Sequence, residues 1–151
     1  MKSNIALSYK AFFLAVIVIV SGCGRQSSFD GFEKYVSSFE AESKLRGINI
    51  DASKRSLKIE FANMASNHRA ICHSGFLENP TITVNPSNWS NQNESGKKWI
   101  MFHELGHCLL GKGHNSDLSS DGEPVSIMHP SLFNWAHFEL NSKEYFDQLF
   151  L

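Results

Sequence analysis

The stretch HELGHCLLGKGH, residues 103–114, constrains the folding of this chain more than any other part of it. His103 and His107 are four residues apart, so on a helix they lie about one turn apart on the same face. That spacing lets two imidazole nitrogens reach one zinc ion, at about 2.0 to 2.1 Å each. Glu104 follows at about 100° around the helix, where its carboxylate can contact a water on the metal without binding the metal itself.

A third histidine, His114, can join the other two only if the chain reverses its direction. On a continuous helix, a rise of about 1.5 Å per residue would carry His114 roughly 10 Å beyond His107. Gly111 and Gly113 lie where the reversal must occur, and glycine is the residue that ends helices in left-handed conformations. We therefore expect a turn near Gly111 and three histidine ligands, which leave the fourth position of a catalytic zinc site open.

Residues 103–114, together with Ser126-Ile127-Met128, resemble the metzincin clan of zinc endopeptidases. In that clan the third histidine follows a glycine, and a downstream methionine turn passes beneath the metal, which assigns Met128 to the turn. The resemblance covers about a tenth of the chain. It implies an α+β fold, a small metzincin-like domain with a twisted, mostly parallel sheet, an antiparallel edge strand, a backing helix, an active-site helix, the methionine turn and a C-terminal helix.

The sequence departs from the clan pattern HExxHxxGxxH in its spacing. Leu110 and Gly113 occupy the places of the glycine and the third histidine, and the Gly-x-x-His unit begins one residue later, so that it ends at His114. Either the active-site helix is one residue longer, or the third ligand differs. Asp117 and His129 are the alternative ligands.

A second departure follows the methionine. Several metzincin families carry a tyrosine two residues after it, able to reach the metal or the transition state, and this chain has Pro130 there. No tyrosine is therefore assigned to stabilise the oxyanion. Tyr145 could take that role, but packing within the final helix is the expected one.

The N-terminus has the pattern of an export signal. Lysines precede an apolar run over residues 11–20, which is too short to span a membrane. The next residues complete Val20-Ser21-Gly22-Cys23, which resembles the lipobox of bacterial lipoproteins, whose cysteine is lipidated and becomes the new N-terminus. We expect residues 1–22 to be a lipoprotein signal peptide and residues 23–151 to be a single zinc metallopeptidase domain with a lipid attached at Cys23.

Composition and export narrow the range of partners. The formal net charge is −1 and no basic stripe is present, so nucleic acid is not expected as a partner. We expect a monomer tethered to a membrane by its lipid, on the outer membrane or cell surface because Gly24 follows the lipidated cysteine, with the periplasmic face as an alternative. In an oxidising compartment Cys72 and Cys108 are expected to form a disulfide, the alternative being two buried thiols.

The resemblance implies zinc-dependent hydrolysis of peptide bonds in peptide or protein substrates. Zinc would lower the pKa of a bound water, and Glu104 would be the general base that accepts its proton. One alternative is a non-catalytic zinc-binding lipoprotein, in which Glu104 would be dispensable, and another is a structural lipoprotein without a metal. A zinc peptidase of another architecture would take its third ligand from a downstream glutamate: Glu123, Glu139 or Glu144.

Hydrophobic periodicity predicts three helices. Phenylalanines and a valine at helical spacing predict a helix over residues 28–46 with a serine N-cap. A second helix over 97–110, capped by Ser95, carries His103 and His107. A third helix is predicted over 142–149.

Alternating apolar and polar residues predict strands around residues 48–50, 57–61, 71–72 and 81–84. Prolines flank the last of these and favour an edge strand, where a missing N–H costs no ladder bond and an extended peptide could pair. Residues 85–96 are rich in asparagine and serine and predict a loop. The acidic residues 117–123 lack the EF-hand calcium pattern and predict a solvated turn.

Overall fold

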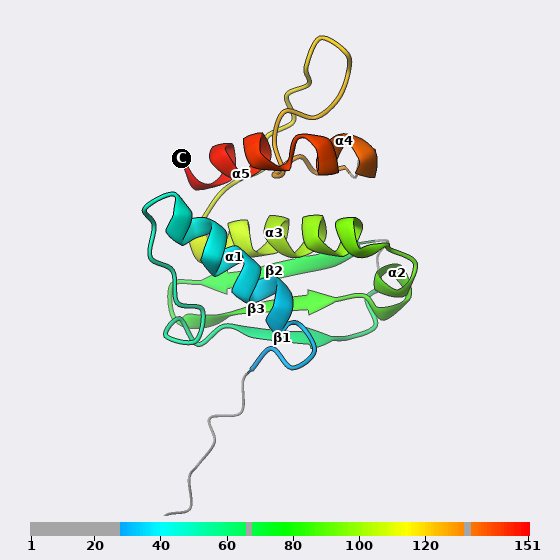
Figure 1. Cartoon of the computed structure of the whole chain (residues 1–151). Coiled ribbons are helices and arrows are strands. Elements are labelled where there is room, and N and C mark those ends of the chain that lie inside the picture. The colour runs from blue at the N-terminus through cyan, green and yellow to red at the C-terminus, as the bar shows by residue number, and fades with distance from the viewer. Residues whose placement is uncertain (1–27, 66–67, 132–133) are drawn as a thin grey trace, which may run out of the picture.

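The computed structural model of the chain describes residues 28–65, 68–131 and 134–151 (Figure 1). The expected signal peptide over residues 1–22 and the lipid site at Cys23 lie outside the described residues. Within those residues, five helices and one three-stranded sheet confirm an α+β fold. The elements in chain order are α1 (Glu33–Leu45), β1 (Lys58–Phe61), β2 (Ala70–Gly75), β3 (Glu78–Val84), α2 (Pro86–Ser90), α3 (Glu94–Leu110), α4 (Trp135–Leu140) and α5 (Ser142–Phe150).

The sheet has the strand order β1-β3-β2. Its central strand β3 runs parallel to β1 and antiparallel to β2, so the sheet is mixed rather than mostly parallel. The antiparallel edge strand is β2, which is longer than the strand predicted around residues 71–72. Residues 48–50 are not a strand, and Ile48 and Ile50 instead pack partly buried against the core.

The prediction that residues 81–84 form an edge strand is wrong, because they belong to the central strand and Ile82 is fully buried. Pro80 is accommodated since pairing with β1 begins only at Thr81, so its missing N–H removes no bond to that strand. Pro86 starts α2, and a helix tolerates proline in its first turn because the N–H there has no partner within the helix.

One face of the sheet is buried and the other is exposed. Cys72, Ile82 and Ile59 are aligned across the three strands on the inner face, which packs against α3. Lys58 and His73 lie on the outer face and are exposed. The helix α1 packs against α3 and contributes its own buried stripe to the same core. This arrangement places α3 beside the edge strand β2.

The first helix is shorter than predicted. It begins at Glu33, and the expected serine cap is wrong because the N-cap is Phe32, which makes no side-chain cap bond. The Ser28 hydroxyl instead donates to the Leu57 carbonyl, and the Ser28 carbonyl accepts from the Ile59 N–H at 2.8 Å. These bonds tie the preceding turn to the beginning of β1, which explains why the helix cannot start there.

Residues 85–96 contain more structure than the predicted loop. The Asn85 side chain accepts two backbone N–H groups at the beginning of α2, and Asn93 caps α3 in place of the predicted Ser95. The Ser95 hydroxyl donates to Glu139 instead. An asparagine just before a proline or an acidic first turn is a recognisable N-cap signal, so both helix starts leave a trace in the sequence.

The C-terminal helices cover α3 on the side away from the sheet (Figure 1). The helix α5 agrees with the prediction over 142–149, whereas α4 was not predicted. The Phe146 ring lies 4.7 Å from the Phe102 ring, centroid to centroid. The helix α3 therefore lies between the sheet and the C-terminal helices, and most of its residues are buried. No helix in the described part of the chain is long and apolar enough to cross a membrane.

Candidate metal centre

The reversal of the chain occurs at Gly111. The helix α3 ends at Leu110, and Gly111 adopts the left-handed conformation with φ of 65°. The Gly111 N–H donates to the His107 carbonyl at 3.2 Å, and the Lys112 N–H donates to the Gly106 carbonyl at 3.1 Å. The helix α3 thus continues through Leu110, as the first explanation for the shifted spacing requires. The chain then runs back toward the histidine face of α3.

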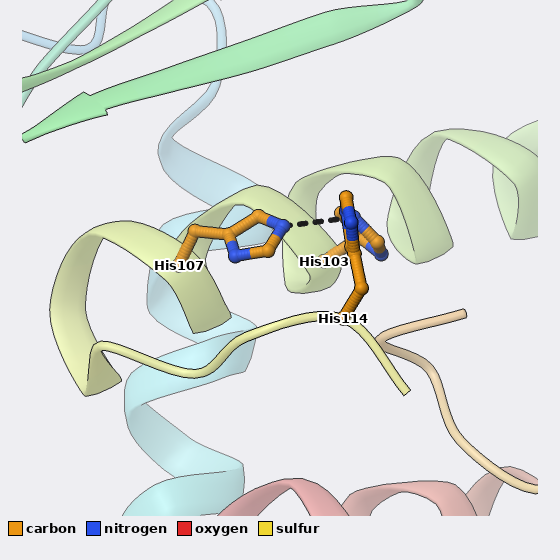
Figure 2. Close-up of side chains that lie close together, drawn as sticks. All are labelled: His103, His107 and His114. Carbon is orange, nitrogen blue, oxygen red and sulfur yellow. Dashed lines mark hydrogen bonds between the residues drawn. The ribbon is translucent and has the colours of Figure 1, made fainter. Parts of the chain in front are cut away.

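The three histidines converge on one point (Figure 2). The Nε2 atom of His103 lies 3.0 Å from Nε2 of His107 and 3.2 Å from Nε2 of His114. His103 is buried, His107 is partly buried and His114 is exposed. Among the described residues, these three form the only group of metal-ligating side chains that could hold an ion. The alternative ligands do not belong to it: Asp117, His129, Glu123, Glu139 and Glu144.

Backbone carbonyls fix the tautomers of the two helical histidines. Nδ1 of His103 lies 2.8 Å from the Ile127 carbonyl, and Nδ1 of His107 lies 2.6 Å from the Lys112 carbonyl. A carbonyl only accepts, so each Nδ1 carries the proton and each Nε2 presents a lone pair. Neither carbonyl partner was predicted, because a main-chain acceptor leaves no signal in the sequence.

Two lone pairs that face each other at 3.0 Å repel unless a cation lies between them. A proton is disfavoured, because burial lowers the pKa of His103 to about 4. A metal ion fits better, since two nitrogens bound at about 2.0 to 2.1 Å to a tetrahedral zinc lie about 3.3 to 3.4 Å apart. The described residues therefore include three histidines that could hold a metal ion, and two of them are already oriented by backbone carbonyls.

The turn formed by Ser126-Ile127-Met128 packs against α3 at Gly106. A Cβ atom added at Gly106 would lie 2.7 Å from Sδ of Met128, so only glycine lets the turn approach this closely. The Met128 N–H donates to the Ser126 hydroxyl, and the Met128 carbonyl accepts from the Asn115 N–H at 3.1 Å. The turn thus contacts the helix between the two histidines and is bonded to the residue after His114.

Glu104 is buried beside the histidines, with 7% of its surface exposed. Burial raises the pKa of its carboxyl to about 7, and a hydrogen bond from the Cys72 backbone offsets part of that rise. A disulfide with an S–S distance of 2.01 Å joins Cys72 to Cys108, the pair expected from the sequence. The edge strand β2 is thus attached to α3 one turn beyond Glu104.

A cavity of about 690 Å³ lies between β2 and the histidine face of α3. All three histidines and Glu104 line it. Trp99 lines it as well, with its ring centroid 5.0 Å from that of His103, and is also part of the core. The carboxyl and the metal site therefore open into the same space, which is large enough to hold several atoms of a ligand.

Tyr145 is remote from this cavity. Its hydroxyl donates to the Pro124 carbonyl at 2.5 Å, and its side chain is buried in the core, as predicted. Residues 117–123 form a turn closed by their own bonds, in which the Ser119 hydroxyl donates to the Glu123 carbonyl at 2.8 Å. No tyrosine hydroxyl lines the cavity in the part of the chain that the structure describes.

No protein-family model, no curated protein and no solved structure matches this chain.

Proposed function

We propose that the protein is a zinc-dependent endopeptidase with a metzincin-like active site. The observation that supports this most is the convergence of three histidine Nε2 atoms beside a buried glutamate in one cavity. On His103 and His107 the Nε2 atom carries a lone pair, because Nδ1 carries the proton. Imidazole ligands suit zinc, and three protein ligands leave the fourth position open for chemistry. Zinc, when bound there, supplies Lewis acidity and lowers the pKa of a water at the site.

Glu104 is the general base in this proposal. Its carboxylate accepts a proton from the attacking water and passes it to the nitrogen of the leaving amine. Burial raises the pKa of this carboxyl in the metal-free chain, and a raised pKa makes the carboxylate a stronger base. The Cys72 amide holds the carboxylate in place.

The edge strand β2 supports a peptide substrate. It forms one wall of the cavity, and its outer edge has no partner strand in the described sheet. An extended peptide can bind by adding to such an edge through main-chain hydrogen bonds. The sequence suggests that a peptide could pair with residues 81–84. In this proposal it pairs with the edge strand β2 instead.

The metzincin-like assignment is supported by three features taken together. They are a helix that carries the first two histidines, a glycine-ended turn that returns His114, and a methionine turn packed on Gly106. The one-residue shift and the missing tyrosine distinguish the chain from the usual pattern.

We also propose that the chain is a bacterial lipoprotein at the outer membrane or cell surface, on the strength of the lipobox-like Val20-Ser21-Gly22-Cys23. The parent chain should incorporate labelled fatty acid when it is expressed in bacteria, and the Cys23→Ala variant should incorporate none. Incorporation by that variant would contradict the proposal.

Zinc content and proteolysis of the purified full chain test the main proposal. We expect one zinc per chain, cleavage of casein or a peptide mixture, loss of cleavage with a chelator, and recovery with zinc. Glu104→Gln should keep the zinc and lose about 10³-fold in rate. Glu94→Gln is the matched control, because Glu94 lies on the same helix with an exposed carboxylate. Equal rates for Glu104→Gln and the parent would leave the non-catalytic zinc-binding protein as the better explanation.

A further inference from the structure

The side chains that line the cavity include more cations than carboxylates. Apart from the histidines, the described side chains that bring charge to it are Glu104, Arg69 and Lys112, so the general base is the only carboxylate among them. Because Glu104 is assigned to the attacking water in the proposed mechanism, neither cation has an anionic partner among these lining residues. A ligand that enters the cavity therefore meets a wall with positive charge.

Arg69 is the more unusual of the two cations. It is partly buried, and burial lowers the pKa of its guanidinium. Nevertheless, its side chain takes part in none of the ion pairs found among the described residues. Arg46 shows the usual arrangement, since its guanidinium lies 2.6 Å from Glu42 and 2.8 Å from Asp147. Removing a cation from water without supplying an anion is unfavourable, so a ligand carboxylate would gain a partner already partly desolvated.

The backbone around Arg69 is fixed in place. Its carbonyl accepts from the Asn85 N–H at 2.9 Å, and the next residue, Ala70, is the buried first residue of β2 and pairs with Val84. Its guanidinium is thus carried at the beginning of the edge strand along which we propose that the peptide binds. Trp99 and Ile100, in the helical turn before His103, line the same cavity.

Lys112 is less suited to select a ligand. It lies in the turn after α3, and its carbonyl already holds His107. An ammonium is a strongly hydrated point charge, whereas a guanidinium offers a planar pair of N–H groups that matches both oxygens of a carboxylate.

We propose that Arg69 binds a carboxylate of the substrate, so that the peptidase selects peptides with an acidic side chain or a free C-terminal carboxylate close to the cleaved bond. This inference rests on the proposed function for the identity of the ligand as a peptide. The two sources of the carboxylate share one chemistry, and peptides that carry each of them separately distinguish the sources.

Binding can be measured without cleavage in the zinc-loaded full chain carrying Glu104→Gln. The probes are fluorescent peptides that are neutral except for one glutamate, placed at each position in turn, with a glutamine counterpart for each. Every peptide is made with a free and with an amidated C-terminus. We expect at least one glutamate peptide, or the free-carboxylate form, to bind about tenfold more tightly than its neutral counterpart, which is typical of a hydrogen bond to a charged group.

Substitutions at Arg69 assign the preference to its side chain. Arg69→Gln, added to Glu104→Gln, should abolish the tenfold difference, and Arg69→Lys should retain part of it. Lys54→Gln is the matched control for total charge, because Lys54 is exposed in a turn outside the cavity, and it should keep the full difference. Circular dichroism and zinc content establish that each variant is folded and loaded.

Three outcomes would overturn the inference: equal affinity for charged and neutral peptides, a preference that survives Arg69→Gln in a folded chain, or a preference that is lost equally in Lys54→Gln. Cleavage by the parent chain is scored separately. A preference that depends on Arg69 in a chain that cleaves nothing would reject the peptidase and retain the carboxylate site. Cleavage without any preference for a carboxylate would retain the peptidase and reject the carboxylate site.

Discussion

Nδ1 of His103 donates to the main-chain carbonyl of Ile127 at 2.8 Å, across 24 positions of the sequence. The bond joins α3 to the turn that carries Met128 and decides which nitrogen of His103 faces the other histidines. The turn is therefore part of the candidate metal site, although none of its side chains belongs to the histidine group. Outer partners of this kind raise metal affinity by fixing the ligand before the ion arrives.

Gly106→Ala should disturb this arrangement. The new methyl group would lie 2.7 Å from Sδ of Met128, so the turn must move and take the Ile127 carbonyl with it. We expect a loss of about 1 to 3 kcal/mol in the free energy of unfolding and about 10- to 100-fold in zinc affinity. Gly113→Ala is the control, since a methyl group there would meet nothing within 4 Å. Chemical denaturation and chelator competition measure the two effects, and equal behaviour of the two variants would contradict the role given to Met128.

His114→Ala tests the third ligand. Zinc affinity should fall by more than about 100-fold, beyond the range caused by losing an outer hydrogen-bond partner. His129→Ala should keep zinc affinity close to the parent value, because His129 does not belong to the converging group. Chelator competition at fixed pH gives both affinities. If His129→Ala proved the more damaging, the ligand set would have to be reassigned.

Glu104 gives the stability of the zinc-free chain a definite pH dependence. Its pKa is raised from 4.5 to about 7, so the folded chain holds this proton more tightly than the unfolded chain. The free energy of unfolding therefore falls as the pH rises between these two values. Glu104→Gln lacks the ionisable group and should exceed the parent by about 3 kcal/mol above pH 7, with no difference below pH 4.5.

Urea denaturation across this pH range, with a chelator present, measures the difference. Glu94→Gln serves as the control, because the exposed Glu94 carboxylate has a lowered pKa and should produce no gain in stability above pH 7. A constant difference between Glu104→Gln and the parent at every pH would mean that the carboxyl is not perturbed by burial.

Reduction of the disulfide should weaken both the fold and the site. Cys72 and Cys108 are 36 residues apart, and closing a loop of that length stabilises a domain by about 4 kcal/mol in the chain-entropy treatment. The same loss is expected for the double variant Cys72→Ser with Cys108→Ser. Denaturation with and without reductant measures it, and the double variant should not respond to the reductant. A parent chain that is equally stable under both conditions would contradict the role of the bridge.

The histidine cluster could be predicted from the sequence because its geometry is local. Helical periodicity places His103 beside His107, and Gly111 supplies the turn that returns His114. The acceptors that orient the first two rings are main-chain carbonyls, and Arg69, which lines the cavity just before β2, lies far from the histidines in the sequence. Nothing in a linear pattern shows such tertiary neighbours.

The position of a strand within the sheet is where sequence and structure differ most. Proline next to residues 81–84 favours an edge, but a proline is excluded from a central strand only where a neighbouring strand needs its N–H. Since β1 is short, Pro80 faces no such demand. The sequence predicts that residues 81–84 are extended, and it cannot predict how far a partner strand will reach along them.

The sequence has one more residue between the second and third histidines than the usual motif, and the turn at Gly111 accommodates it. One more residue on α3 rotates its end by about 100°, and the flexible step at Gly111 absorbs that rotation. The three imidazoles thus still converge, although the number of residues between His107 and His114 differs from the usual motif. A sequence motif with fixed spacing is therefore more restrictive than the coordination geometry. Three-histidine sites with a longer or shorter loop between the second and third histidines would not match the motif.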